Sequence, residues 1–266
     1  MAIVTKQLIS QLYEKYKSID VSFNKDVVKT TGLQPKKVYL KFKDRQRPCV
    51  LYSCSFESAR IIVALTDTLV QRLQDNETNL SLRFSFLRDE TPKPIEHNFF
   101  IQSRLISHSI LSEDQPNLYI LTLSYSTRPP DDLIETLGFL LEANVNATKR
   151  KEERILITVD SMKTLRLGSK NCILCIDSIP RKGILRDLSF SGCKIIIQGN
   201  AKFLINKTVF VKMISDKGES FQIKGKILRF EEVQGRRDLA VIALYFALED
   251  LSLSYKMMIN NYLFNR

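Results

Sequence analysis

The feature that most constrains the fold is a succession of short runs in which apolar and polar residues alternate. Between residues 21 and 126 such runs include KKVYLKFK, LSLRFSFLR and NLYILTLSYS, and turn-rich stretches such as TGLQP, DNETN and SEDQPN separate them. Alternation with a period of two is typical of strands that bury one face, and Gly, Pro, Asp and Asn are typical of the turns between them. The first half of the chain is therefore predicted to form an antiparallel barrel or sandwich.

The same pattern resumes after residue 154 and predicts a second barrel. Its expected strands include RILITVDS, TLRLG, NCILCIDS, GCKIIIQG, KTVFVKMIS and DLAVIALYFAL. Helical spacing of apolar residues predicts three helices, at residues 5–17, from Pro129 to about Val145, and at 249–264. The 266 residues suit two domains. We expect a mainly β protein with helical attachments: an N-terminal domain at 1–143, a charged linker at 144–154 and a C-terminal domain at 155–266.

Composition excludes several classes of function. Five Cys, an odd number, and only two His give no set of about four ligands for a structural metal, so Cys172-Ile-Leu-Cys175 is interpreted as part of a buried strand. No phosphate-binding glycine loop, HExxH or GxSxG motif occurs, and we expect neither a catalytic site nor a metal site. The N-terminus carries charges where a signal peptide would be apolar, and no run approaches the ~20 apolar residues of a membrane span. We therefore expect a cytoplasmic protein.

Positive charge is concentrated in the second half. Residues 1–145 carry 18 Lys and Arg against 17 Asp and Glu, whereas residues 146–266 carry 22 against 12. This asymmetry indicates an anionic partner for the C-terminal domain, either a free nucleotide, a nucleic acid or an anionic lipid headgroup. A basic surface that serves only solubility is the alternative.

Two motifs in the basic half stand out. Arg150 and Arg154 form an RxxxR sequence just before the second barrel, and Asp187-Leu-Ser-Phe-Ser-Gly192 forms a DxSxxG sequence between two predicted strands. Each alone is weak, because basic linkers and Asp-x-Ser turns are common. In this order, followed by GCKIII and later by QIKGKILRFEEV and a closing helix, they resemble the signature of the PilZ domain.

The resemblance covers about residues 147–266 and implies a small β-barrel receptor for cyclic di-GMP. A divergent barrel before a PilZ domain is similar to the two-domain PlzA-type receptors of spirochaetes, so the fold implied is two tandem PilZ-like barrels. Residues 1–143 contain neither RxxxR nor DxSxxG. The first barrel is therefore interpreted as a degenerate PilZ-like domain that lost, or never had, the ligand site.

The residue types in these motifs suit the dinucleotide. The planar fork of Arg150 or Arg154 can donate two parallel bonds to guanine O6 and N7 or to phosphate, and its plane can stack on a purine. Ionised Asp187 can accept the N1–H and N2–H of guanine. Ser189 can donate to phosphate, and Gly192 can approach the ligand closely or adopt a positive φ. Turn capping is the structural alternative for these last residues. Secondary ligand contacts are expected from Lys149, Phe190 and Ser191.

The sequence thus predicts a non-enzymatic cyclic di-GMP receptor in which linker arginines close over the ligand and the two domains are repositioned. Such a receptor would signal to a downstream protein partner, which the sequence does not identify, and we expect a monomer without cofactors. The alternative is a nucleic-acid-binding protein, because small basic barrels commonly bind single strands. Nucleic-acid binding should weaken steeply with salt, whereas dinucleotide binding should depend on it weakly.

Overall fold

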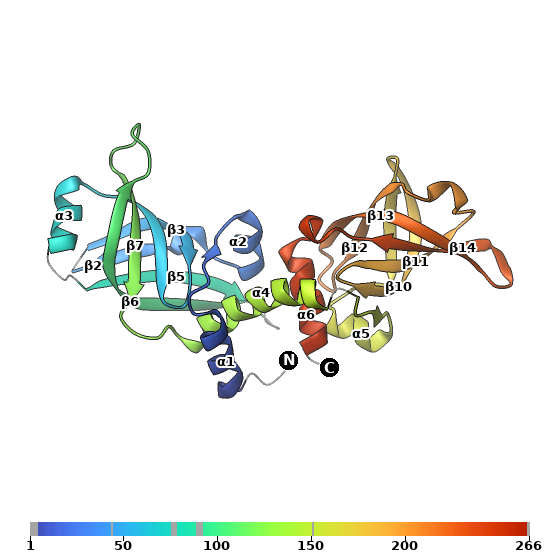
Figure 1. Ribbon diagram of the computed structural model, residues 1–266, viewed down its shortest axis with the longest axis horizontal. Coiled ribbons are helices and arrows are strands. Elements are labelled where there is room, and N and C mark those ends of the chain that lie inside the picture. Colours follow the sequence, from blue (N-terminus) through green and yellow to red (C-terminus); the bar gives the residue numbers. More distant parts are fainter. Residues whose placement is uncertain (1–4, 44, 76–78, 89–92, 151, 265–266) are drawn as a thin grey trace. The chain divides into compact units, whose positions relative to one another are not determined.

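The computed structural model describes residues 5–43, 45–75, 79–88, 93–150 and 152–264. Its contacts divide the chain into two compact units, one up to Leu141 and one from Glu142. Each unit contains a β-barrel with short helices attached (Figure 1). None of the helices in these ranges is long and apolar enough to cross a bilayer.

The first unit forms a closed six-stranded barrel. Its strand order is β3-β2-β5-β6-β7-β4, all neighbours are antiparallel, β3 also pairs with β4, and β1 lies outside on β3. The elements are α1 (Lys6–Tyr16), β1 (Val21–Ser22), α2 (Lys25–Thr31), a 3-10 turn (Pro35–Lys37), β2 (Tyr39–Phe42), β3 (Arg45–Cys54), β4 (Ser58–Ala64), α3 (Asp67–Asp75), β5 (Leu80–Arg88), β6 (Ile95–Ile110) and β7 (Leu118–Tyr125), followed by α4 (Asp131–Lys149).

The second unit repeats this topology. Its barrel order is β10-β9-β12-β13-β14-β11, β11 also pairs with β10, and β8 lies outside on β10. The elements are β8 (Ile155–Leu156), α5 (Val159–Thr164), β9 (Asn171–Ile176), β10 (Ile179–Ser189), β11 (Gly192–Gln198), a 3-10 turn (Lys202–Leu204), β12 (Thr208–Ile214), β13 (Ser220–Val233), β14 (Arg236–Tyr245), a 3-10 turn (Leu248–Asp250) and α6 (Leu253–Phe264).

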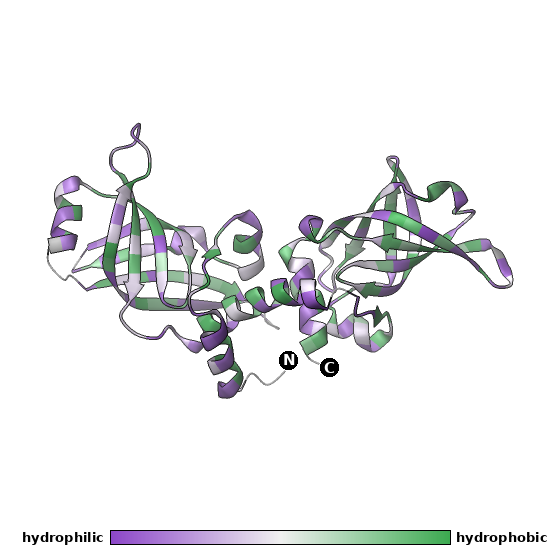
Figure 2. Ribbon diagram, in the orientation of Figure 1, coloured by the Kyte–Doolittle hydropathy of each residue, from purple (hydrophilic) through white to green (hydrophobic). Residues whose placement is uncertain are grey.

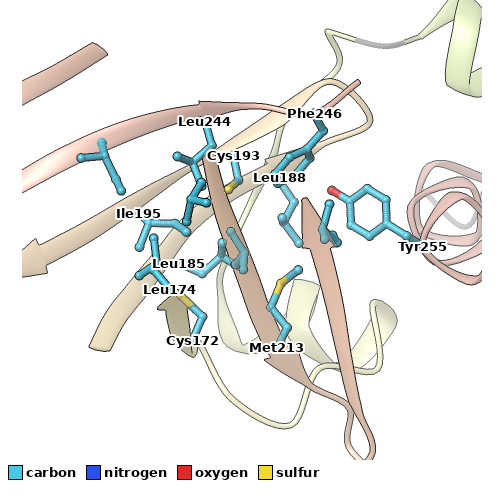
Figure 3. Close-up of a cluster of buried hydrophobic side chains, with 14 of the residues drawn as sticks. Cys172, Leu174, Leu185, Leu188, Cys193, Ile195, Met213, Leu244, Phe246 and Tyr255 are labelled. Atoms are coloured by element: carbon cyan, nitrogen blue, oxygen red, sulfur yellow. The ribbon is translucent and has the colours of Figure 1, made fainter. Parts of the chain in front are cut away.

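Alternation along the strands builds both cores. In β12, for example, Val209, Val211 and Met213 are buried, and the residues between them are exposed. Figure 2 shows the same change between hydrophobic and hydrophilic residues along the strands of both barrels. Side chains from several strands and from α6 fill the second barrel (Figure 3). The predicted mainly β fold with two antiparallel barrels is confirmed.

The sequence interpretation missed three short helices and misjudged one boundary. The helices α2, α3 and α5 have six to nine residues, and α2 and α5 are marked mainly by their N-caps, Asn24 and Thr158. The strand predicted at TLRLG is wrong, because α5 runs to Thr164 and a turn follows it. The helix α4 ends at Lys149 rather than near Val145, because Ala143 and Ala147, four residues apart, are both buried. Residues 144–149 of the predicted linker are therefore helical.

Candidate functional site

The last turns of α4 position Arg150 on the C-terminal domain. Ala147 is 2% exposed and belongs to the core of the second barrel. The side-chain amide of Asn146 donates to Oδ1 of Asn260 in α6 over 2.8 Å. The Arg150 N–H donates to the Asn146 carbonyl, which extends the helical hydrogen bonding to this residue. The Arg150 side chain is exposed, and its guanidinium contacts no partner among the residues that the structure describes. The helix end is thus anchored, whereas the cation remains available.

The other arginine of the motif lies against the acid of the second motif. Arg154 directly precedes β8, which pairs with β10 through Ile155 and Leu188. Its Nη1 donates to Oδ1 of Asp187 over 2.7 Å, although 33 positions separate the two residues. The backbone N–H of Lys194 donates to the same oxygen over 2.9 Å. The side chains of Arg154 and Asp187 are 38% and 9% exposed, so the acid is nearly buried while part of the guanidinium faces solvent.

The Ser189 hydroxyl is used inside the turn. Ser189 is fully buried, and its Oγ donates to the Gly192 carbonyl over 3.1 Å. Its own carbonyl accepts the hydroxyl of Tyr255 over 2.7 Å. Figure 3 shows Tyr255 extending from α6 with its hydroxyl towards Leu188. Burial raises the pKa of Tyr255 well above its ordinary value, so the phenol keeps its proton. The turn is therefore held from within by a helix that the motif does not include.

Close packing of strands explains the glycine of the motif. A Cβ on Gly192 would lie 2.0 Å from the carbonyl oxygen of Leu244, so only glycine permits β14 to pair there. The glycines with positive φ are others, so the positive φ considered for Gly192 is wrong. Phe190 is fully buried in the core and presents no side chain to the surface, and Ser191 is 8% exposed. The residue types at these positions are therefore explained largely by the packing of the turn.

The surface around the ion pair is basic and partly apolar. Lys149 and Arg186 are exposed, and Nζ of Lys194 lies 3.2 Å from a carboxylate oxygen of Glu231. Leu156 pairs with Asp187 across β8 and β10 and is 68% exposed. The sequence interpretation did not single out Leu156, because within RILITVDS it reads as an ordinary strand residue. No group of three or more metal-ligating side chains occurs in the described ranges.

The first barrel has a counterpart of this site. Ser53 pairs with Ser22 of β1 and with Arg60 of β4, just as Asp187 pairs with Leu156 of β8 and with Lys194 of β11. In both barrels a register shift immediately precedes this position. By topology, Ser53 therefore corresponds to Asp187.

The charges of the counterpart are exchanged. Asp20, which directly precedes β1, corresponds to Arg154, which directly precedes β8. The Nη2 of Arg60 lies 2.6 Å from Oδ2 of Asp20, and its Nε donates to the Ser53 hydroxyl over 3.0 Å. An acid thus stands where the C-terminal site has its arginine, and an arginine stands on the neighbouring strand. Ser58 corresponds to Gly192 by the same pairing.

Comparisons with known proteins agree with two related domains. The family model described as PilZN3 domain matches residues 7–144, and the model described as PilZ domain matches residues 148–265. The chain is 39% identical over 263 residues to a cyclic di-GMP binding protein of Treponema denticola, covering 98% of this chain and 83% of that protein. Among solved structures it is similar to Borreliella burgdorferi PlzA in complex with c-di-GMP, with 21% identity, a TM-score of 0.43, and coverage of 96% of this chain and 98% of that one. Escherichia coli YcgR in complex with c-di-GMP matches with 10% identity, a TM-score of 0.31, and coverage of 90% and 86%.

Proposed function

Because the chain belongs to the PilZ family, with a PilZN3 domain before its PilZ domain, we propose that it is a non-enzymatic receptor whose C-terminal domain binds cyclic di-GMP. The observation that carries the proposal is the contact between Arg154 and Asp187. It joins the RxxxR and DxSxxG motifs at one edge of the second barrel. The homologue from Treponema denticola, a cyclic di-GMP binding protein, supports the choice of ligand.

Arg154 and Arg150 are proposed as the main ligand contacts. Asp187 fixes Nη1 of Arg154, and the remaining N–H groups of the guanidinium can donate to phosphate or to guanine O6 and N7. Arg150 has no competing partner in the described part of the chain, so it can turn to the ligand without breaking an ion pair. Both arginines carry charge that complements the two phosphates of the dinucleotide.

Asp187 is proposed to act in two ways. Both of its observed hydrogen bonds use Oδ1, from Arg154 and from the Lys194 N–H. Its other oxygen accepts no bond from the described residues, so it can receive a guanine N–H if the ligand reaches this edge. The exposed side chain of Leu156 beside it offers apolar surface to a purine face.

The remaining motif residues are proposed to shape the site rather than to contact the ligand. The hydroxyl of Ser189 and the backbone of Gly192 hold the turn that carries Asp187 towards β11. Lys149 and Ser191 stay secondary contacts, and Phe190 supports the turn from the core. The first barrel is proposed to lack a cyclic di-GMP site, because Asp20 places negative charge where a phosphate ligand would need an arginine.

The signal is proposed to pass through α4. This helix begins after the first barrel and ends at Lys149, next to Arg150. A ligand bound by Arg150 and Arg154 would pull on the end of α4 and reposition the domains for a downstream protein partner. Small-angle scattering with and without cyclic di-GMP should report this change, and identical profiles at saturation would contradict repositioning.

Isothermal titration of the full chain tests the binding itself. Cyclic di-GMP should bind saturably, and guanosine at the same concentration should bind at least about tenfold more weakly, because it offers one guanine and no phosphate. Equal binding of both compounds, or no heat with cyclic di-GMP, would contradict the proposed function.

A further inference from the structure

A basic pocket lies at one end of the first barrel. It has a volume of about 400 Å³, within the range of small-ligand sites, and its lining contains three arginines and no carboxylate among the described residues. The whole first half of the chain carries nearly balanced charge, so this local excess of arginine is specific to the pocket. The polar residues of its lining are Arg45, Arg47, Thr66, Thr68, Arg72 and Asn117.

The strand pattern directs two of these arginines towards the barrel mouth. Cross-strand partners lie on the same face of a sheet. Arg47 pairs with Leu40 and Arg45 with Phe42, and both of these partners are buried in the barrel. Further along β3, Cys49 on the same face is also buried. The inward face of β3 therefore continues beyond the core and ends in two exposed arginines.

Neither Arg45 nor Arg47 has a carboxylate partner in the part of the chain that the structure describes. Among the described residues, Arg45 and Arg47 form no ion pair and no side-chain hydrogen bond. Two guanidinium groups two residues apart on one strand face repel each other, and an anion between them would relieve that repulsion. Unpaired arginines at the rim of a concave site therefore favour an anionic ligand.

The opposite wall of the pocket supplies neutral donors and a third cation. The hydroxyls of Thr66 and Thr68 lie 3.2 Å apart at the start of α3. Thr68 and Arg72 are four residues apart and share a face of this helix. The Leu65 N–H donates to the Asn117 carbonyl over 2.9 Å, which fixes the loop before β7 beside the end of β4. Figure 1 shows α3 beside the first barrel.

We propose that this pocket is a second anion site, specific to the N-terminal domain, that binds the phosphoryl group of a small phosphate or phosphate monoester. Arginine forks match phosphate oxygens, and hydroxyl and amide donors complete the coordination of a dianion. The proposal does not depend on cyclic di-GMP binding, because all of the pocket residues belong to the first domain.

Two-dimensional amide NMR of the full chain, titrated at low salt, tests the site. The probes are inorganic phosphate and adenosine 5′-monophosphate, with adenosine as the uncharged control. Saturable shifts should centre on residues 45–47 and 64–72 with the two phosphate-bearing probes and be absent with adenosine. Stronger binding of the monophosphate than of inorganic phosphate would indicate that the pocket takes an organic phosphate, and the reverse would indicate free phosphate.

Matched variants separate this site from general electrostatic attraction. Arg47→Gln should weaken phosphate binding about tenfold. Arg104→Gln removes the same charge from an exposed position on β6 outside the pocket and should leave binding within about twofold. Arg150→Ala/Arg154→Ala should also leave it unchanged, whatever its effect on cyclic di-GMP. Equal losses in Arg47→Gln and Arg104→Gln, shifts spread over the surface, or no saturation would overturn the proposal.

Discussion

Removing the guanidinium of Arg154 should weaken cyclic di-GMP binding while the chain stays folded. Arg154 is 38% exposed but Asp187 only 9%, so losing the ion pair should cost more than losing an exposed pair, about 1–3 kcal/mol of stability, and the Lys194 N–H still bonds to the carboxylate. A charge-assisted contact to the ligand is worth about 1.5–3 kcal/mol, which corresponds to a ten- to hundredfold change in affinity. Isothermal titration and urea unfolding of Arg154→Ala measure the two quantities separately.

Asp187→Asn tests whether the acid acts through the arginine. The amide oxygen can still accept the Lys194 N–H, but the charge that holds Arg154 is lost. Affinity should fall about two- to tenfold. Because the two residues share one contact, the double variant should lose less binding energy than the sum of the single variants.

Arg236→Ala is the control for charge. Arg236 begins β14, nine residues before Tyr245, which pairs with Gly192. At about 3.3 Å per residue it lies about 30 Å along the strand from the motif turn. Its substitution removes the same charge and should leave affinity within about twofold. If Arg154→Ala binds as well as Arg236→Ala does, or if the effects of Arg154→Ala and Asp187→Asn simply add, the proposed coupling of the two motifs is refuted.

Four further predictions concern the first barrel, the turn and the thiols. Arg150→Ala/Arg154→Ala should show no residual cyclic di-GMP binding by titration; saturable binding that remained would place a site in the first barrel. Gly192→Ala should lower the urea midpoint more than Gly218→Ala, because its Cβ would meet the Leu244 carbonyl at 2.0 Å whereas Gly218, at φ +81°, has open space; equal midpoints would contradict this. Tyr255→Phe should lower the free energy of unfolding by about 1–3 kcal/mol, because it leaves the buried Ser189 carbonyl without a hydrogen-bond donor. Tyr262→Phe on the same helix should lower it little. Similar losses in the two variants would refute the role of that bond. Burial raises the pKa of Cys49, Cys54 and Cys172 to about 12, so alkylation of the native protein at pH 8, mapped by mass spectrometry, should favour the less buried Cys175. Rapid labelling of Cys49, Cys54 or Cys172 would contradict their burial. Stability should also fall as the pH rises above about 9, because the thiols of the unfolded chain ionise first.

The barrels could be predicted because their signal is repeated at every strand. Period-two alternation in runs such as KTVFVKMIS reflects a simple rule, one face buried and one exposed, which β12 follows throughout. The short helices carried no comparable signal. In α5, six residues begin at a capping box between Thr158 and Ser161, and caps of this kind are hard to distinguish from turns in a sequence.

The site could be predicted only in part, because residue type does not reveal burial. The motif pair predicted Arg154 and Asp187 at one ligand, and the structure brings their side chains into direct contact. Ser189 and Gly192 were expected at the ligand, but their polar and steric requirements are met inside the turn. Tyr255 lies in the helix predicted at 249–264, but its hydroxyl bond to the Ser189 carbonyl depends on a fold that brings together residues 66 positions apart.

The exchange of acidic and basic residues between the barrels shows how one strand topology can carry different charges at the corresponding edge of each barrel. Buried alternation is required by the fold and persists in both domains, whereas the edge beside β1 or β8 is partly exposed and its charges can change without loss of the core. These charges must change together. If Asp20 alone were replaced by arginine, the new guanidinium would face Arg60, and Ser53 between them carries no negative charge. The two like charges would repel each other, which would favour neither folding nor ligand binding. A ligand edge like that of the second barrel would also need an acid at Ser53. Because no single substitution restores such an edge, the first barrel can diverge towards other ligands while keeping the same strand order.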